Sequence, residues 1–498
     1  MTSNLCLTVR FLQPYYHGRT DGDEPEWPPS PLRMFQALVA AAAARWRNTE
    51  FREHAGPALD WLEQQAAPSI VAPAAMPAAE KYRLYVPDNT ADLAAGTWSR
   101  GDTTKIVRRT EKDVRHTQLD GEAVHYLFPV GSDFQHFDTL RATARSLTHL
   151  GWGVDMVVGD AAMVSEQGYS QLPGERWSPI ESISADGYRV PVEGTLDALT
   201  RKHSAFLRRI SRDEKGNESF NPVPSISAFR VVPYRRATEP PGRPYAVFEL
   251  RNDDGTRYSH RQEQLIHIAG MVRHLSIELM TKHPPEGIPA TWAETYVAGH
   301  RDKDSQEHRQ FSYLPLPSIG HAHTDPAVRR VMIAAPLGDD RLLRHLAKWL
   351  TGLKLQPTSQ SKIPHPPSLV RVQHDNIAAF YTMPSTAWAS VTPVILPGHD
   401  DHKPAKTRKL IEKALAQSGL DQPCEFEWSA FSRFPKSLSA HKYDKERKPT
   451  GYIRPSHLLD QTAVHLTLRF KNDVKMPGPL AIGAGRHCGF GVLAVDAK

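Results

Sequence analysis

Cysteine is scarce in this sequence, and long apolar runs are missing. The three cysteines, Cys6, Cys424 and Cys488, lie far apart and form no CxxC pair, which argues against a disulfide framework or a cysteine-rich zinc site. No stretch of about eighteen apolar residues occurs, and the alanine-rich segment 38–44 is too short to span a membrane. The first residues also lack the basic and apolar parts of a secretory signal. We therefore expect a cytoplasmic protein without a membrane segment.

Positive charge is concentrated near the end of the chain. The 498 residues, enough for two or three domains, carry a formal net charge of +6. Between Asp401 and Lys475 there are 15 Lys and Arg against 9 Asp and Glu, so this segment alone carries 15 − 9 = +6. Such a segment is either a solvated basic surface or a binding surface for a polyanion.

The first half has the pattern of an α+β domain. Residues 5–12 alternate as in a strand, and apolar residues recur at helical spacing from Leu32 to Trp46. Ser30 suits the N-cap of this helix and Pro31 its first turn. Further helices are predicted over 137–150, ended by Gly151, and over 196–210. A polar run over 211–219 and prolines at positions 222 and 224 follow the last of these helices, and we place the domain boundary near residue 222.

The second half reads as two βαββαβ-like units, about 226–360 and 385–498. The first has predicted strands at 245–250, 311–316 and 328–335, with helices over 262–280 and after Gly338. The second has predicted strands at 388–396, 464–470 and 492–495, with a helix over 404–418. This repeated order predicts an α+β fold of tandem ferredoxin-like modules.

A glycine-rich loop precedes the last predicted strand. Its sequence, IGAGRHCGFG, places Gly483, Gly485, Gly489 and Gly491 around Arg486 and His487. Glycines let a backbone approach a ligand and turn successive N–H groups toward phosphate oxygens. The loop lacks the Gly-Lys-Ser/Thr ending of nucleotide phosphate loops, and a strand follows it. The alternative is a tight turn with a purely structural role.

The loop and three other stretches resemble a known family. The loop reads GxGxxxGFG and precedes the final predicted strand, which is similar to the signature of the repeat-associated RNA-binding superfamily of CRISPR systems. Residues 16–41, 298–325, 391–396 and 478–493 extend the match over nearly the whole chain. They resemble the fused subunit of type I-G (formerly I-U) CRISPR effector complexes, in which a Cas-five-like half is joined to a Cas-six-like half.

The resemblance implies a function. A Cas-six-like half, 223–498, would cut the repeat of a CRISPR precursor RNA without a metal or other cofactor, and a Cas-five-like half, 1–222, would hold the 5′ handle of the guide RNA. Cleavage would proceed by attack of the 2′-OH, for which histidine and a nearby cation supply the base, the acid and the charge stabilisation. The implied partners are the guide RNA and its precursor, and the backbone and large subunits of the complex. Target DNA would be reached only through that complex.

The sequence offers two groups of catalytic candidates. The first lies on loops within the matching stretch and comprises His300, His308, His321 and His323. Here the chain departs from the family pattern, since His323-Thr324-Asp325-Pro326 stands where the family has HADG. The second group is the pair His267 and His274 on the predicted helix 262–280. His321 and His323 are also spaced as half of a metal site, but no third ligand stands out, so we expect no metal.

Several basic and aromatic residues are RNA-contact candidates. Besides the loop residues, the candidates in the basic segment are Lys406, Lys409, Lys436, Lys442, Arg447 and Lys448, and those for the 5′ handle are His17, Trp27 and Arg33. Trp27 is equally suited to fastening its loop onto the following helix. Two rival functions remain open. One is a non-catalytic cap that binds RNA cut by another nuclease, and the other is a histidine-metal hydrolase.

Overall fold

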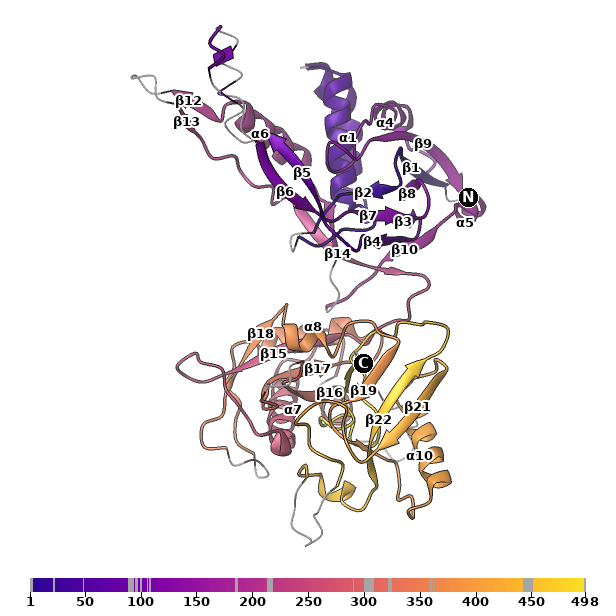
Figure 1. Ribbon diagram of the computed structural model, residues 1–498, viewed down its shortest axis with the longest axis vertical. Coiled ribbons are helices and arrows are strands. Elements are labelled where there is room, and N and C mark those ends of the chain that lie inside the picture. The colour runs from indigo at the N-terminus through magenta and orange to yellow at the C-terminus, as the bar shows by residue number, and fades with distance from the viewer. Residues whose placement is uncertain are drawn as a thin grey trace. The chain divides into compact units, whose positions relative to one another are not determined.

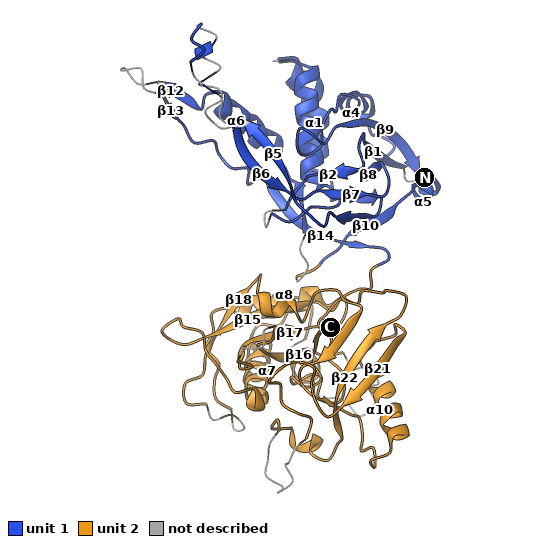
Figure 2. Cartoon of the chain, viewed as in Figure 1, with its two compact units in different colours: residues 1–181, 185–238 blue, residues 182–184, 239–498 orange. Residues whose placement is uncertain are grey.

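The chain divides into two compact units. The computed structural model describes residues 3–20, 23–47, 49–87, 94, 97–98, 101–104, 106, 109–183, 187–212, 218–289, 291–299, 309–320, 325–358, 361, 363–441 and 451–496. Unit 1 comprises residues 1–181 and 185–238, and unit 2 comprises 182–184 and 239–498 (Figure 2). Unit 1 thus continues past the boundary expected near residue 222, because the strand at 229–236 pairs within its sheet.

Unit 1 is built around a ferredoxin-like core. Its elements follow the chain order β1 (Ser3–Phe11), α1 (Pro31–Arg45), β3 (Ser69–Ala72), β8 (Ala123–Val130), α4 (Phe137–Ala144) and β9 (Val157–Ser165). The strands pair antiparallel in the order β3-β8-β1-β9, which is the order of a split βαβ fold. Ser30 is the N-cap of α1 and Pro31 follows it, as expected.

Additional elements extend this core. Strands β10 (Glu175–Pro179), β14 (Phe229–Arg236) and β11 (Gly187–Pro191) widen the sheet beyond β3. A small sheet joins β2 (Tyr15–Tyr16), β7 (Thr117–Leu119) and β4 (Ala75–Pro77), and two hairpins pair β5 (Tyr82–Pro87) with β6 (Arg109–Val114) and β12 (Ile210–Arg212) with β13 (Glu218–Phe220). The remaining helices are η1 (Phe51–Ala55), α2 (Gly56–Glu63), α5 (Glu166–Gln171) and α6 (Thr195–Leu207). Figure 1 shows α6 and the two hairpins on one side of α1 and the sheet on the other.

Unit 2 begins with a complete ferredoxin-like module. Its order is β15 (Tyr245–Arg251), η2 (Gln262–Gln264), α7 (Leu265–Lys282), η3 (Ala293–Val297), β16 (Ser312–Pro317), β17 (Val328–Ala334), α8 (Asp340–Leu350) and β18 (Ser368–Val372). The strands pair antiparallel in the order β16-β17-β15-β18. The apolar residues of α7 and α8 share one core cluster with the helix-facing side of this sheet.

The second module of unit 2 lacks one helix. After α9 (Asn376–Ala379) come β19 (Ala387–Ser390), β20 (Val394–Ile395), α10 (Pro404–Gln417), β21 (Cys424–Ser429), η4 (Ser456–Leu458), β22 (Ala463–Phe470) and β23 (Leu493–Val495). β22 pairs with β21 and with β19, and β19 pairs with β23, which repeats the ferredoxin-like strand order. Between β22 and β23 the glycine-rich loop stands where the first module has α8.

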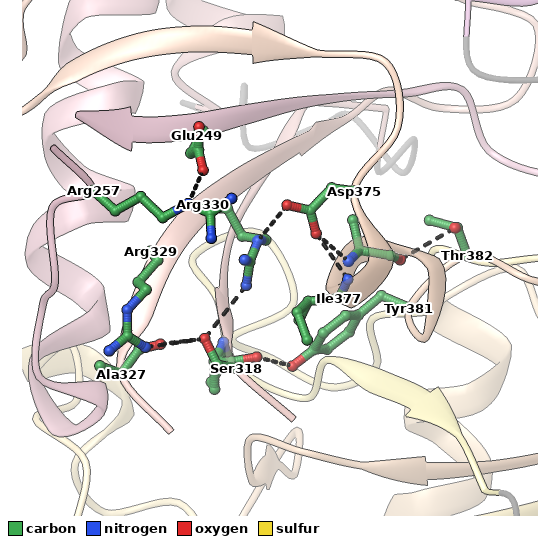
Figure 3. Close-up of polar contacts among 12 residues, drawn as sticks. Glu249, Arg257, Ser318, Ala327, Arg329, Arg330, Asp375, Ile377, Tyr381 and Thr382 are labelled. Carbon is green, nitrogen blue, oxygen red and sulfur yellow. Dashed lines mark hydrogen bonds and ion pairs between the residues drawn. The ribbon is translucent and has the colours of Figure 1, made fainter. Parts of the chain in front are cut away.

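The two modules of unit 2 are packed together. Val247, Leu316 and Met332 of the first sheet share an apolar cluster with Val391 and Val492 of the second module. At the end of this interface the buried Arg330 Nε donates to Asp375 Oδ2 over 3.0 Å, and Asp375 also caps α9 (Figure 3). Apolar packing and one buried ion pair therefore hold the modules together.

The expected α+β class and ferredoxin-like modules are confirmed, while some element ends differ. The helix predicted over 137–150 ends at Ala144, because Leu147 and Leu150 reach the core from turns and so continue the apolar pattern beyond the helix. The strand predicted over 388–396 is split into β19 and β20. Among the described residues, no helix is both long and apolar enough to cross a membrane.

Candidate functional site

The glycine-rich loop has a backbone that other residues cannot follow easily. Gly483, Gly489 and Gly491 have φ values of 95°, 91° and 62°. A Cβ atom on Gly491 would lie 1.9 Å from the oxygen of Ile482, and one on Gly489 would lie 2.6 Å from Leu265 Cδ1. The glycines are therefore required both by the left-handed backbone and by close packing.

Several backbone N–H groups of the loop donate hydrogen bonds to carbonyl groups of the same chain. The N–H of Ala484 donates to Ile395 over 2.8 Å and that of Gly491 to Pro393 over 2.9 Å, while Cys488 and Phe490 donate to Gly485. These four amides are therefore occupied within the chain, and the expectation that loop amides bind phosphate stays a prediction for other amides of the loop. The loop also accepts a hydrogen bond from Tyr313 of β16 at the His487 carbonyl, over 3.0 Å. It is thus fixed against the first module.

Two arginines lie close together beneath the loop. Arg486 is 6% exposed, and its Nη1 donates to the Gly483 carbonyl. Burial, and to a smaller extent the charge of Arg486, lower the pKa of Arg243 to about 10. Arg243 donates to Ser312 Oγ over 2.9 Å, and the same hydroxyl lies 3.0 Å from His487 Nδ1. Arg486 therefore belongs to the loop's interior, contrary to the expectation of a direct surface contact.

A histidine pair lies at the start of α7. The rings of His260 and His267 are 5.9 Å apart, and Tyr258 stacks on His260. His260 is buried, and its Nε2 lies 3.1 Å from the Gln264 carbonyl. His267 is half-buried. Burial lowers the pKa of His267, and burial is also the largest cause of the lowered pKa of His260. Both rings are therefore favoured in the neutral form, in which a ring nitrogen can accept a proton.

The start of α7 also meets the basic segment and the glycine-rich loop. Gln262 Nε2 donates to the Lys436 carbonyl over 2.9 Å, and its Oε1 accepts from Tyr452. Tyr452 in turn packs edge-on against Phe490 of the loop. Lys436 is exposed. The backbone of Lys436 and, through Tyr452, the glycine-rich loop thus meet the start of α7 at Gln262. We call this region, together with His260 and His267, the α7 site.

Other described candidates lie away from the α7 site. His274 is exposed further along α7. Lys406 and Lys409 are exposed on α10, which lies apart from α7 in Figure 1, and Lys406 Nζ is paired with Asp401 over 2.7 Å. The remaining candidates lie outside the described residues, namely His300, His308, His321, His323, Lys442, Arg447 and Lys448.

The three handle candidates in unit 1 are held by the protein itself. His17 is 1% exposed; its Nδ1 lies 2.5 Å from Asp155 Oδ1, and its Nε2 bonds the Tyr82 hydroxyl. Arg33 pairs with Glu26. Trp27 Nε1 donates to the Pro73 carbonyl over 3.0 Å, so Trp27 fastens its loop. A direct contact with RNA is not available to His17 in this arrangement, whereas Tyr82 is 38% exposed.

Two other chemistries can be assessed from the described residues. Burial raises the pKa of Cys488 to about 12, so its sulfur stays a thiol and is a poor nucleophile. In the described part of the chain, no group of three or more His, Cys, Asp or Glu side chains is arranged to hold a metal ion.

Sequence reasoning missed several residues of the α7 site. His260 lies outside any periodic element and reaches the site because its backbone pairs with Val328 at the start of β17, over 2.9 and 2.8 Å. Arg243 precedes β15 and carries no motif. No periodicity or motif in the sequence therefore selects either residue.

The fold and the site together define a class of protein, in which tandem ferredoxin-like modules share a glycine-rich loop. The model of the CRISPR-associated protein, GSU0054 family, matches residues 7–495, and the chain belongs to that family. It is similar to a CRISPR protein from Archaeoglobus fulgidus, at 13% identity and a TM-score of 0.19, over 39% of this chain and 72% of that one. It is also similar to a Cas6 product complex, at 13% identity and a TM-score of 0.23, over 51% and 98% of the two chains. No curated protein matches it.

Proposed function

We propose that the protein is an endoribonuclease that processes CRISPR precursor RNA and stays bound to the mature guide as a subunit of a type I-G interference complex. Its second unit acts as a Cas-six-like half that cuts the repeat, and its first unit as a Cas-five-like half that holds the 5′ handle. The complex also contains backbone and large subunits, and the protein works in the cytoplasm. Membership of a CRISPR-associated family supports this proposal.

The observation that carries the catalytic part is the half-buried His267, whose ring lies 5.9 Å from that of His260 and whose pKa is lowered by burial. A neutral imidazole can accept the proton of the 2′-OH while that oxygen attacks the adjacent phosphate. The bond to the 5′-oxygen then breaks, the leaving oxygen takes a proton, and the products are a 2′,3′-cyclic phosphate and a 5′-OH. Lys436 and Arg261, both exposed near the start of α7, would stabilise the negative charge that develops on the phosphate.

The decisive experiment is a single-turnover cleavage assay with a labelled repeat hairpin in excess EDTA. We expect one discrete cut, and no cut when the attacking ribose carries 2′-deoxy. H267A should slow the cut by about a hundred- to ten-thousand-fold, with unchanged hairpin affinity. H365A is the matched control, since His365 is an exposed histidine of the same unit, and it should cut at the wild-type rate.

The remaining histidines belong to the same series. H274A, H300A, H308A, H321A and H323A test the other candidates one by one. Full activity in H267A with loss in one of these would move the catalytic base to that residue. Tight binding without any cut by the wild type would instead identify a non-catalytic RNA-binding cap, and loss of the cut in EDTA would identify a metal-dependent hydrolase.

A further inference from the structure

An exposed aromatic pair lies at the far end of α7. The rings of His283 and Trp349 are stacked with centroids 3.8 Å apart and planes inclined by 4°. Trp349 is 38% exposed, and His283 is also exposed. The pair lies sixteen residues beyond His267, so roughly 24 Å away at 1.5 Å per helical residue. It is therefore separate from the α7 site.

The pair is held in place by a third ring. His345 Nε2 lies 2.8 Å from the His283 carbonyl, where it donates its proton, and its ring lies 6.4 Å from that of Trp349. His283 directly follows the C-terminus of α7, while His345 and Trp349 lie on α8. The stack is thus preformed by the contact between two helices, and a ligand would not have to order it.

The outer face of α8 adds positive charge beside the stack. Arg341, Arg344 and Lys348 are exposed and spaced three and four residues apart, so they lie on one helix face. They extend over about 10 Å of the helix. Arg344 also lies close enough to Arg371 to lower the pKa of that guanidinium, although burial is the larger cause. Like charges held together are unfavourable until an anion approaches them.

The carboxylates at the start of α8 are occupied elsewhere. Asp339 accepts hydrogen bonds from Tyr296 and from Arg309, and Asp340 accepts the amide proton of Ile183 over 2.9 Å. Arg341 donates one hydrogen bond to the Glu286 carbonyl over 3.2 Å. Because a carbonyl is uncharged, this contact does not compensate the charge of Arg341. The surface formed by His283, Arg341, Arg344, His345, Lys348 and Trp349, which we call the stacking platform, therefore presents three exposed cationic side chains beside the aromatic stack.

We propose that the stacking platform binds a single-stranded RNA segment. An unpaired base continues the His283–Trp349 stack, and Arg341, Arg344 and Lys348 contact the phosphates next to it. A base-paired helix would not offer its base faces to these rings, so the occupant is a single strand. The proposal rests on the proposed RNA-binding function and extends it, because it gives the RNA that flanks the cut a second attachment on the first module.

The test measures the affinity of the full chain for a labelled, unstructured oligouridine by fluorescence anisotropy at several salt concentrations. W349A should bind about ten-fold more weakly, as expected for one lost base–aromatic stack. W349F should restore most of the affinity. R344E should weaken binding and lower the salt dependence by about one phosphate contact. L337A and K354E are the controls, since they alter an exposed apolar residue and an exposed ion-paired lysine near α8.

The outcomes separate this proposal from the cleavage mechanism. Cleavage of a repeat hairpin without single-stranded flanks should be unchanged in W349A, whereas H267A should keep its oligouridine affinity. Wild-type affinity in W349A, or an equal loss in W349A and L337A, would overturn the platform. So would a W349A variant that binds RNA normally but no longer associates with a protein subunit, since that would mark a protein interface.

Discussion

The two modules of unit 2 have the same strand order but join their third and fourth strands in different ways. In the first module the connection is α8, which covers one face of the sheet with Leu343, Leu346 and Leu350. In the second module the connection contains the glycine-rich loop, which leads from β22 to β23. The helix α8 packs against the sheet of its own module, whereas the glycine-rich loop packs on α7 and β16 of the other module.

This difference explains why the α7 site draws on both modules. Gly489 lies against Leu265 and Pro315, which belong to α7 and β16. Phe490 lies against Tyr452, whose hydroxyl donates to Gln262. These contacts need a glycine, since a Cβ atom at Gly489 would collide with Leu265 and Pro315. The connection that has a loop in place of a helix therefore packs against the α7 site of the neighbouring module.

Among the substitutions considered, the largest loss of stability is expected at Asp375, in the contact between the modules. D375A should lower the free energy of unfolding by about 3–5 kcal/mol, because it leaves the buried Arg330 without its partner; the side chains of the pair are 4% and 10% exposed. It also removes the cap on the amides of Ile377 and Ala378. Chemical denaturation measures the loss. D253A removes the exposed partner of Lys354 and should cost at most about 1 kcal/mol. Equal losses in the two variants would contradict this account.

A glycine in each connection allows a direct comparison. Gly491 ends the loop at φ 62°, and Gly352 follows α8 at φ 85°. G491A should cost roughly 2–5 kcal/mol, since a left-handed alanine is strained and its Cβ would meet the Ile482 oxygen. G352A has no atom within 4 Å of its Cβ and should cost only about 1–2 kcal/mol. Thermal unfolding of the two variants checks the order, and a larger loss in G352A would contradict it.

The smallest expected effect is on the pH dependence of the free energy of unfolding, through His465 on β22. Burial lowers the pKa of His465, although the carbonyls of Leu438 and Ser390 oppose this. The unfolded chain therefore binds more protons than the folded one as pH falls below about 6.5, and stability decreases toward acid. H465Q should flatten this dependence by up to about 1.4 kcal/mol per pH unit. Denaturation midpoints between pH 5 and 7 measure it, and an unchanged slope would show that His465 titrates normally.

Much of the fold could be predicted from periodicity, because both modules of unit 2 alternate strands and helices with clear apolar patterns. α10 was expected over 404–418 and spans Pro404–Gln417, since Pro404 suits a first helical turn and Gly419 follows its end. The extent of unit 1 could not be predicted in the same way. β14 follows a proline-rich segment, and only its pairing with β10 and β11 assigns it to the first sheet.

The site was only partly predictable, because residue type does not reveal burial. His17 and His267 are both histidines near a strand or helix start, yet His17 is enclosed by Asp155 and Tyr82, whereas His267 is half-buried. Arg486 was expected to face a ligand and instead lies inside the loop. Such differences arise from contacts between segments that are distant in sequence, and the sequence alone does not show which segments meet.

The packing of Gly489 on Leu265 also has a consequence for biosynthesis. A ribosome releases α7 long before it reaches the glycine-rich loop, so the first module can fold while the surface that receives the loop is still bare. Nascent chains and prematurely terminated chains would expose that surface to the cell. The contact between α7 and the loop can therefore form only after the glycine-rich loop has been synthesised and has emerged from the ribosome.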